Sequence, residues 1–194
     1  MKISFTGKDG ILHLGGVLLA LCLIIALALG YVNSITADRI AESAEQQLQQ
    51  SMKDIIPTAD RFNEIAIPGG EASIITRAFE IIKDGVYVGL CVQVAPNGFS
   101  GPINMVVAVY KSGAVLGVHI VSMTETIGLG TQVDDPEWLV QFEGLSAPFT
   151  VVKNAAPGEG DIAAVSGATV SSRAVTQGVT AAAEFVLSYT PEVK

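Results

Sequence analysis

The chain has 194 residues and a formal net charge of −8, and 49% of its residues are hydrophobic. This size corresponds to one domain plus an additional apolar segment. The acidic balance, with no basic patch and no aromatic platform, argues against a nucleic-acid-binding protein. The two cysteines provide no disulfide framework, since Cys22 lies in an apolar run and Cys91 in a predicted strand.

A run near the N-terminus is long and apolar enough to cross a membrane. From Ile11 to Val32 it contains no Asp, Glu, Lys or Arg. About 22 residues with a rise of 1.5 Å each span roughly 33 Å, which matches the hydrocarbon layer. A signal-peptide core has only about 7–15 apolar residues. We therefore expect a short cytoplasmic N-terminus at residues 1–10 and a single transmembrane helix at residues 11–32.

The charges on either side of this run predict its orientation. Lys2 and Lys8 precede it, whereas Arg39 follows it among the acidic residues Asp38 and Glu42. Positive charge favours the cytoplasmic side of a membrane helix. We expect the bulk of the chain to lie outside the inner or plasma membrane.

Residues 33–56 form a polar connector that is rich in Ala, Gln and Glu and ends before Pro57. Within it, Ile40, Ala44 and Leu48 recur every four residues, which predicts a helix with a narrow apolar stripe. We expect this stripe to pack on the chain's own domain. A helix that pairs with a partner in a larger complex is the alternative.

The remaining residues, 57–194, are expected to fold as one α+β domain. Four runs in it are rich in residues that favour strands: 78–83, 86–94, 105–110 and 115–121. Asp84-Gly85 joins the first two runs, and this dipeptide is a strong hairpin signal. The pattern predicts an antiparallel sheet with helices packed against it. His119 stands alone in one of these apolar runs, so we expect no metal site.

A glycine-rich loop follows the last of these runs. Residues 124–131 read Thr-Glu-Thr-Ile-Gly-Leu-Gly-Thr. Gly128 and Gly130 permit positive φ and a close approach of the backbone to a flat ring. Glu125 and Thr126 offer polar contacts to the edge of such a ring. A glycine-rich exit from a strand is the structural alternative.

Residues 161–172, Asp-Ile-Ala-Ala-Val-Ser-Gly-Ala-Thr-Val-Ser-Ser, end a loop and open the last helix, where apolar residues recur at helical spacing. The first backbone N–H groups of a helix lack intrahelical partners and attract anions. Together with the hydroxyls of Thr169, Ser171 and Ser172, they indicate a phosphate or phosphoester site. The alternative is a helix that is merely capped by Ser166 or Thr169.

This last segment resembles the flavinylation motif of the FMN-binding domain in the G subunit of the Rnf complex and the C subunit of sodium-translocating NADH:quinone reductase. In that motif, an Asp several residues before Ser-Gly-Ala-Thr marks the place where a transferase joins FMN to the Thr hydroxyl through its phosphate. The resemblance implies that Asp161 serves transferase recognition and that Thr169 carries covalent FMN. It implies cofactor contacts from residues of two segments: Glu125, Thr126, Gly128, Leu129 and Gly130, and Ser166, Gly167, Ala168, Ser171 and Ser172.

Other landmarks agree in order with the same family over residues 79–187. Residues 96–103 are similar to its Gly-aromatic-x-Gly-Pro-Ile loop, and residues 124–131 to a Glu-Thr-Pro-Gly-Leu-Gly loop that approaches the flavin. Ile127 stands where the family usually has Pro, and Met123 where it often has His. Residues 134–142 are expected to form a short amphipathic helix, with Trp138 in the core.

The resemblance implies a membrane-anchored flavoprotein that passes electrons within the Rnf complex, an ion-translocating ferredoxin:NAD oxidoreductase, without catalysis of its own. Its implied partners are the other membrane and peripheral subunits, the flavin transferase and membrane lipid. The C subunit of the quinone reductase is the nearest alternative, although it is commonly longer. A non-redox binding or assembly module anchored by one helix is the alternative from another class.

Overall fold

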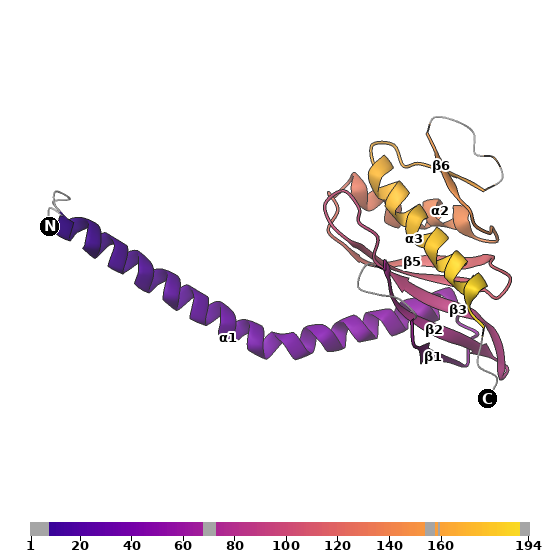
Figure 1. Ribbon diagram of the computed structural model, residues 1–194, viewed down its shortest axis with the longest axis horizontal. Helices are drawn as coiled ribbons and strands as arrows, with labels where there is room; N and C mark the ends of the chain where they lie inside the picture. The colour runs from indigo at the N-terminus through magenta and orange to yellow at the C-terminus, as the bar shows by residue number, and fades with distance from the viewer. Residues whose placement is uncertain (1–7, 68–72, 154–157, 159, 191–194) are drawn as a thin grey trace. The chain divides into compact units, whose positions relative to one another are not determined.

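The computed structural model describes residues 8–67, 73–153, 158 and 160–190, with side chains from residue 13 onward. The chain divides into two compact units, residues 1–46 and 47–194. Figure 1 shows the elements of each unit.

The first unit consists of most of helix α1, which runs without interruption from Lys8 to Ile55. The stretch His13–Ile55 is long and apolar enough to cross a membrane, with a mean hydropathy of 2.5 in its most apolar window. All of its side chains up to residue 47 are exposed, including large apolar ones such as Leu19 and Leu27. The helix thus contains both the expected membrane span and the expected connector.

The last turns of α1 belong to the second unit and pack in its core. Leu48, Met52 and the following Ile56 are buried. They form a cluster with apolar side chains of the sheet: Phe79, Ile81, Cys91, Val106 and Ala108. This part of the predicted apolar stripe therefore packs on the chain's own domain, as expected, while Ile40 is exposed.

The second unit is built on a five-stranded antiparallel sheet in the order β1-β2-β3-β4-β5. Its strands follow one another along the chain: β1 Arg61–Ile65, β2 Ile75–Lys83, β3 Val86–Val94, β4 Ile103–Tyr110 and β5 Val115–Met123. The predicted hairpin is present, because Asp84 and Gly85 join β2 to β3 with φ angles of 51° and 74°. The predicted α+β class is confirmed, and β1 is an additional strand.

Both faces of the sheet are covered, which explains its nearly continuous apolar strands. On one face lies helix α3, Thr169–Ser188, which crosses β3 and β4 (Figure 1). Side chains alternate along β3: Leu90, Val92 and Val94 join the cluster under α3, whereas Cys91 joins the cluster with α1. A small parallel sheet, β6 Thr150–Val152 with β7 Asp161–Ala163, lies before α3 in the chain.

The segment expected as one amphipathic helix, residues 134–142, contains two short contiguous helices, α2 Pro136–Leu139 and η2 Val140–Phe142, and a further one, η1 Gly130–Asp134, precedes them. Asp135 separates η1 from α2, since its extended backbone ends η1 and its side chain caps α2. Trp138 is a core residue, as predicted. Its ring packs edge-on against Phe142, and its Nε1 donates to the carbonyl of Ala163 at 2.7 Å.

We expect Gly89→Ala to lower the free energy of unfolding by about 1–3 kcal/mol. The added methyl group would press against backbone atoms, which cannot rotate away as a side chain can. A methyl group on Gly89 would meet the backbone of Val109 and Tyr110 in the neighbouring strand. Gly178→Ala in α3 is the matched control, since its methyl group would mainly meet the flexible end of Met105. Denaturant unfolding followed by Trp138 fluorescence measures both. A larger loss for Gly178→Ala would contradict this account.

Candidate functional site

Three segments far apart in the chain meet at the carboxylate of Glu125. This side chain is only 7% exposed. Its Oε1 accepts hydrogen bonds from the backbone N–H of Phe99 at 2.7 Å and of Ser100 at 3.3 Å. Its Oε2 accepts one from the hydroxyl of Ser171 at 3.1 Å. We call these four residues the Glu125 junction; it connects the loop before β4, the loop after β5 and the first turn of α3.

Glycines make room for this junction. A Cβ atom on Gly98 would run into Oε1 of Glu125, and one on Gly130 would lie 2.8 Å from its Cβ atom. Gly128 has a φ of 76°, so the expected positive φ is found there, while Gly130 is required for space. Gly130 therefore packs against the Glu125 side chain.

The loop after β5 is held by its own hydrogen bonds. The N–H of Gly128 donates to the hydroxyl of Thr131 at 3.0 Å, and the side-chain amide of Gln132 donates to the carbonyl of Gly128 at 2.7 Å. The carbonyl of Thr126 accepts from the N–H groups of Leu129 and Thr131. These bonds define the turn although Ile127 replaces the proline of the related loops.

Helix α3 begins at Thr169 without a side-chain cap. Its N-cap residue is Ala168, and neither Ser166 nor Thr169 donates or accepts a capping bond. Instead, the buried hydroxyl of Ser172 donates to the carbonyl of Ala168 and accepts from the N–H of Val165, both at 3.0 Å. The alternative of a helix capped by Ser166 or Thr169 is therefore wrong.

The three hydroxyls of this turn lie in different surroundings. Ser171 and Ser172 are at most 1% exposed, and each is hydrogen-bonded within the protein. Thr169 is half-buried, and its hydroxyl makes no hydrogen bond to any described residue. The backbone N–H groups of residues 169–171 likewise donate to no described residue. Of these three hydroxyls, that of Thr169 alone is unengaged among the described residues, and it lies beside three backbone donors without a described partner.

Large apolar side chains are exposed on the same three segments. Ile127 is 91% exposed and Phe99 is 73% exposed, and Leu129 and Val170 are also exposed. Leu129 lies against Gly167, where a Cβ atom would be 2.8 Å from its Cδ1. Exposed apolar groups gathered around polar ones are typical of binding surfaces.

Asp161 lies at the start of β7 and makes no described hydrogen bond to the Glu125 junction. Its Oδ2 accepts a hydrogen bond from the N–H of Gly158 at 3.0 Å, so the carboxylate shapes the turn that enters β7. Among the described residues, no hydrogen bond joins Asp161 to Thr169.

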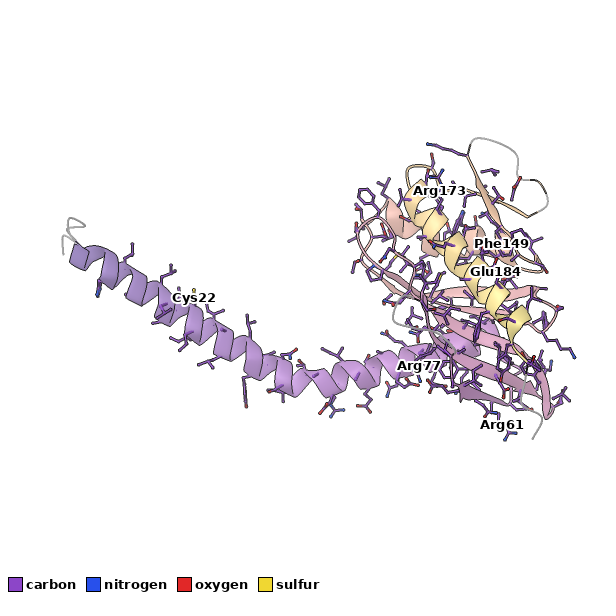
Figure 2. The ribbon with its side chains drawn as sticks, in the orientation of Figure 1. Cys22, Arg61, Arg77, Phe149, Arg173 and Glu184 are labelled. Carbon is purple, nitrogen blue, oxygen red and sulfur yellow. The ribbon has the colours of Figure 1, made fainter. Side chains whose placement is uncertain are left out.

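A groove of about 590 Å³ lies between α3 and β6, and we did not predict it from the sequence. Residues of both elements line it: Phe149, Thr150, Val151, Arg173, Gln177 and Glu184. Figure 2 labels Phe149 before β6, and Arg173 and Glu184 along α3. The sequence does contain one signal that Arg173 lies on the same side of α3 as Thr169: the two residues are four apart, and residues four apart share one face of a helix.

His119 has an acidic neighbour that the sequence did not indicate. Burial raises the pKa of the Asp134 carboxyl, and the nearby His119 opposes this rise. Within the described residues, no group of three or more His, Cys, Asp or Glu side chains could hold a metal ion.

We expect Ser172→Ala to lower the free energy of unfolding by about 1–3 kcal/mol, because the N–H of Val165 loses its acceptor. Ser166→Ala is the matched control in the same turn, since Ser166 is exposed and makes no described hydrogen bond. Ser166→Ala should change the free energy of unfolding by less than about 0.5 kcal/mol. Denaturant unfolding of protein without cofactor measures both variants, and equal losses would contradict the role given to Ser172.

Comparisons with known proteins agree with this arrangement. Residues 98–184 match the family model of the FMN-binding domain, and residues 1–55 match that of the RnfG N-terminal region. The first match therefore contains the Glu125 junction, Thr169 and most of α3.

Two relatives match most of the chain, and one solved structure shares its fold. The G subunit of the ion-translocating oxidoreductase complex of Stutzerimonas stutzeri is 30% identical, over 84% of this chain and 75% of the relative. The G subunit of the proton-translocating ferredoxin:NAD(+) oxidoreductase complex of Clostridium ljungdahlii is 31% identical, over 87% and 88%. The crystal structure of the C subunit of Na(+)-translocating NADH-quinone reductase from Parabacteroides distasonis superposes with a TM-score of 0.51 at 17% identity, covering 68% of this chain and 80% of that one. The chain thus belongs to the RnfG family, the G subunits of ion-translocating oxidoreductase complexes, and contains that family's FMN-binding domain.

Proposed function

We propose that this protein is the electron-carrying flavoprotein subunit of a membrane-bound ion-translocating ferredoxin:NAD oxidoreductase complex, with FMN attached to Thr169 as a phosphoester. Its proposed partners are the other subunits of that complex, a flavin transferase during maturation, and membrane lipid. Family membership supports the assignment to the complex. Asp161 is proposed to serve recognition by the transferase.

The proposed attachment site rests on one observation: the three hydroxyls in the first turn of α3 differ in burial and in hydrogen bonding. A phosphoester requires a hydroxyl that is accessible and not engaged elsewhere. Ser171 donates to Glu125 and Ser172 to the carbonyl of Ala168, and both are buried. Thr169 is the hydroxyl within the first turn of α3 that is left for modification. The exposed Ser166 hydroxyl also makes no described hydrogen bond, but it precedes the helix and its unpaired N–H groups.

The surroundings of Thr169 fit a phosphate diester. The N–H groups of residues 169–171 have no described partner, and they lie at the positive end of a 20-residue helix. Such groups favour a negative charge by about 0.3–1 kcal/mol. Arg173, one turn further on, adds a cation on the same face of the helix. When bound, FMN supplies the redox chemistry, while these groups orient its phosphate.

The apolar surface around the turn fits the flat ring of a flavin. We propose that the ring lies against the loop after β5, along Thr126, Gly128, Leu129 and Gly130. Support comes from the exposed side chains of this loop and its neighbours, which need an apolar partner. The small residues Gly167 and Ala168 let the ring or its chain approach the turn closely.

The alternatives have less support. The quinone-reductase protein shares the fold at 17% identity, and this shows the fold alone. The relatives that match most of the chain are named as G subunits. A non-redox module would need the turn to be an ordinary cap, whereas no side chain caps α3.

We expect wild-type protein, produced with an active flavin transferase, to carry one FMN on the peptide that contains Thr169. Thr169→Ala should fold, because the lost hydroxyl makes no described hydrogen bond, but it should carry no covalent flavin. Peptide mass spectrometry and in-gel flavin fluorescence after denaturation measure the attachment. Ser188→Ala is the matched control, since it removes a hydroxyl at the other end of α3. An unmodified wild-type peptide, or flavin retained by Thr169→Ala, would overturn the attachment site.

We also propose that residues 1–10 are cytoplasmic and that the FMN-binding domain lies outside the inner or plasma membrane. The apolar stretch of α1 and the lysines before it support this orientation.

Impermeant maleimide labelling of intact cells tests this orientation. The native Cys91 should remain unlabelled, because it is fully buried and burial raises the pKa of its thiol to about 12. Cys22 is expected to lie within the membrane. A cysteine placed at the exposed Glu143 should be labelled in intact cells, whereas Lys2→Cys should require permeabilised cells. The reverse pattern would place the domain in the cytoplasm.

A further inference from the structure

Glu125 is a charged side chain that the protein has buried next to the proposed attachment site. It is 7% exposed, and it follows β5 directly in the loop proposed to contact the flavin ring. Both of its oxygens already accept hydrogen bonds from protein groups. Glycines at 98 and 130 are packed against it, so the carboxylate is fixed in place from both sides.

The Glu125 junction determines where the attachment turn lies. Ser171 is two residues after Thr169, and its only described partner is Oε2 of Glu125. The same carboxylate holds the N–H groups of Phe99 and Ser100 through Oε1. Removing the carboxylate would therefore release the first turn of α3 and the loop before β4 from each other.

The partners of Glu125 in the described part of the chain are neutral. Two are backbone N–H groups and one is a hydroxyl, and the described ion pairs involve other residues. Its charge is thus stabilised by dipoles and not cancelled by a cation. A charge in such a site acts on its neighbours more strongly than one in water, because the effective dielectric constant is lower.

We infer that Glu125 is a positioning residue that holds the attachment turn and, through its charge, lowers the reduction potential of the flavin. This inference rests on the proposed attachment of FMN at Thr169. Full reduction of oxidised FMN takes up two electrons from an external donor of lower potential and, to form the anionic hydroquinone, one proton from solvent. The flavin then carries one more negative charge, which the nearby carboxylate disfavours.

Glu125→Gln tests the charge while it preserves the shape. The amide oxygen of Gln can still accept from Phe99 and Ser100, and the Ser171 hydroxyl can rotate to accept from the amide nitrogen. We expect the variant to keep its covalent FMN and to shift the midpoint potential to a more positive value. The expected shift is at least about 30 mV, which is a tenfold change in the equilibrium constant of a two-electron couple.

Two matched variants separate charge from position. Ser171→Ala removes one hydrogen bond of the junction and keeps the charge, so its potential should move less than that of Glu125→Gln. Glu184→Gln removes an exposed carboxylate from the far half of α3, and its potential should equal that of wild type. Dithionite titration of full-length flavinylated protein in detergent, followed by absorbance, measures all of them.

The outcomes distinguish this inference from the proposed function. An unchanged potential in flavinylated Glu125→Gln would overturn the electrostatic role and leave the attachment site standing. Absence of FMN from wild-type Thr169 would instead overturn the proposed attachment. The positioning role is tested without any variant or flavin by hydrogen exchange: the N–H groups of Phe99 and Ser100 should be protected although they lie in a loop. Unprotected amides there would overturn it.

Discussion

The burial of one carboxylate constrains the arrangement of the whole site. A buried charge is stable only where several donors compensate for lost water, and Glu125 obtains them from two segments outside its own loop. Those donors cannot move apart without leaving the charge unpaired. Loop positions that would otherwise depend on weak surface contacts are therefore coupled to each other and to the start of α3.

The sheet supports this coupling, because the two loops start from its strands and α3 packs on it. The loop at Phe99 connects β3 to β4, and the loop at Glu125 leaves the end of β5. Helix α3 lies across the same strands, and its Gly178 admits the side chain of Met105 from β4. The helix can therefore pack closely on the sheet, which places its first turn beside both loops.

Local signals predicted the local structure well. Asp84-Gly85 indicated a hairpin that is present, and the apolar spacing after Thr169 indicated the helix that the structure contains. Contacts between distant segments left no such signal. The bond from Ser171 to Glu125 joins residues 46 positions apart, so the sequence indicated Glu125 as a contact for a flat ring and not as the acceptor that joins three segments. The helix predicted around Trp138 starts two residues later than expected, because Asp135 is the N-cap of α2.

The two engaged serines have a further consequence, which synthetic chemists would describe as protection. A turn with three neighbouring hydroxyls would ordinarily give a mixture of products with any reagent that modifies alcohols. Here folding masks Ser171 and Ser172 inside hydrogen bonds and leaves the half-buried Thr169 without one. Selectivity among these three hydroxyls is thus encoded in the fold, whereas an enzyme acting on this turn would itself have to distinguish Thr169 from the exposed Ser166. Modification of an unfolded chain would lack that control.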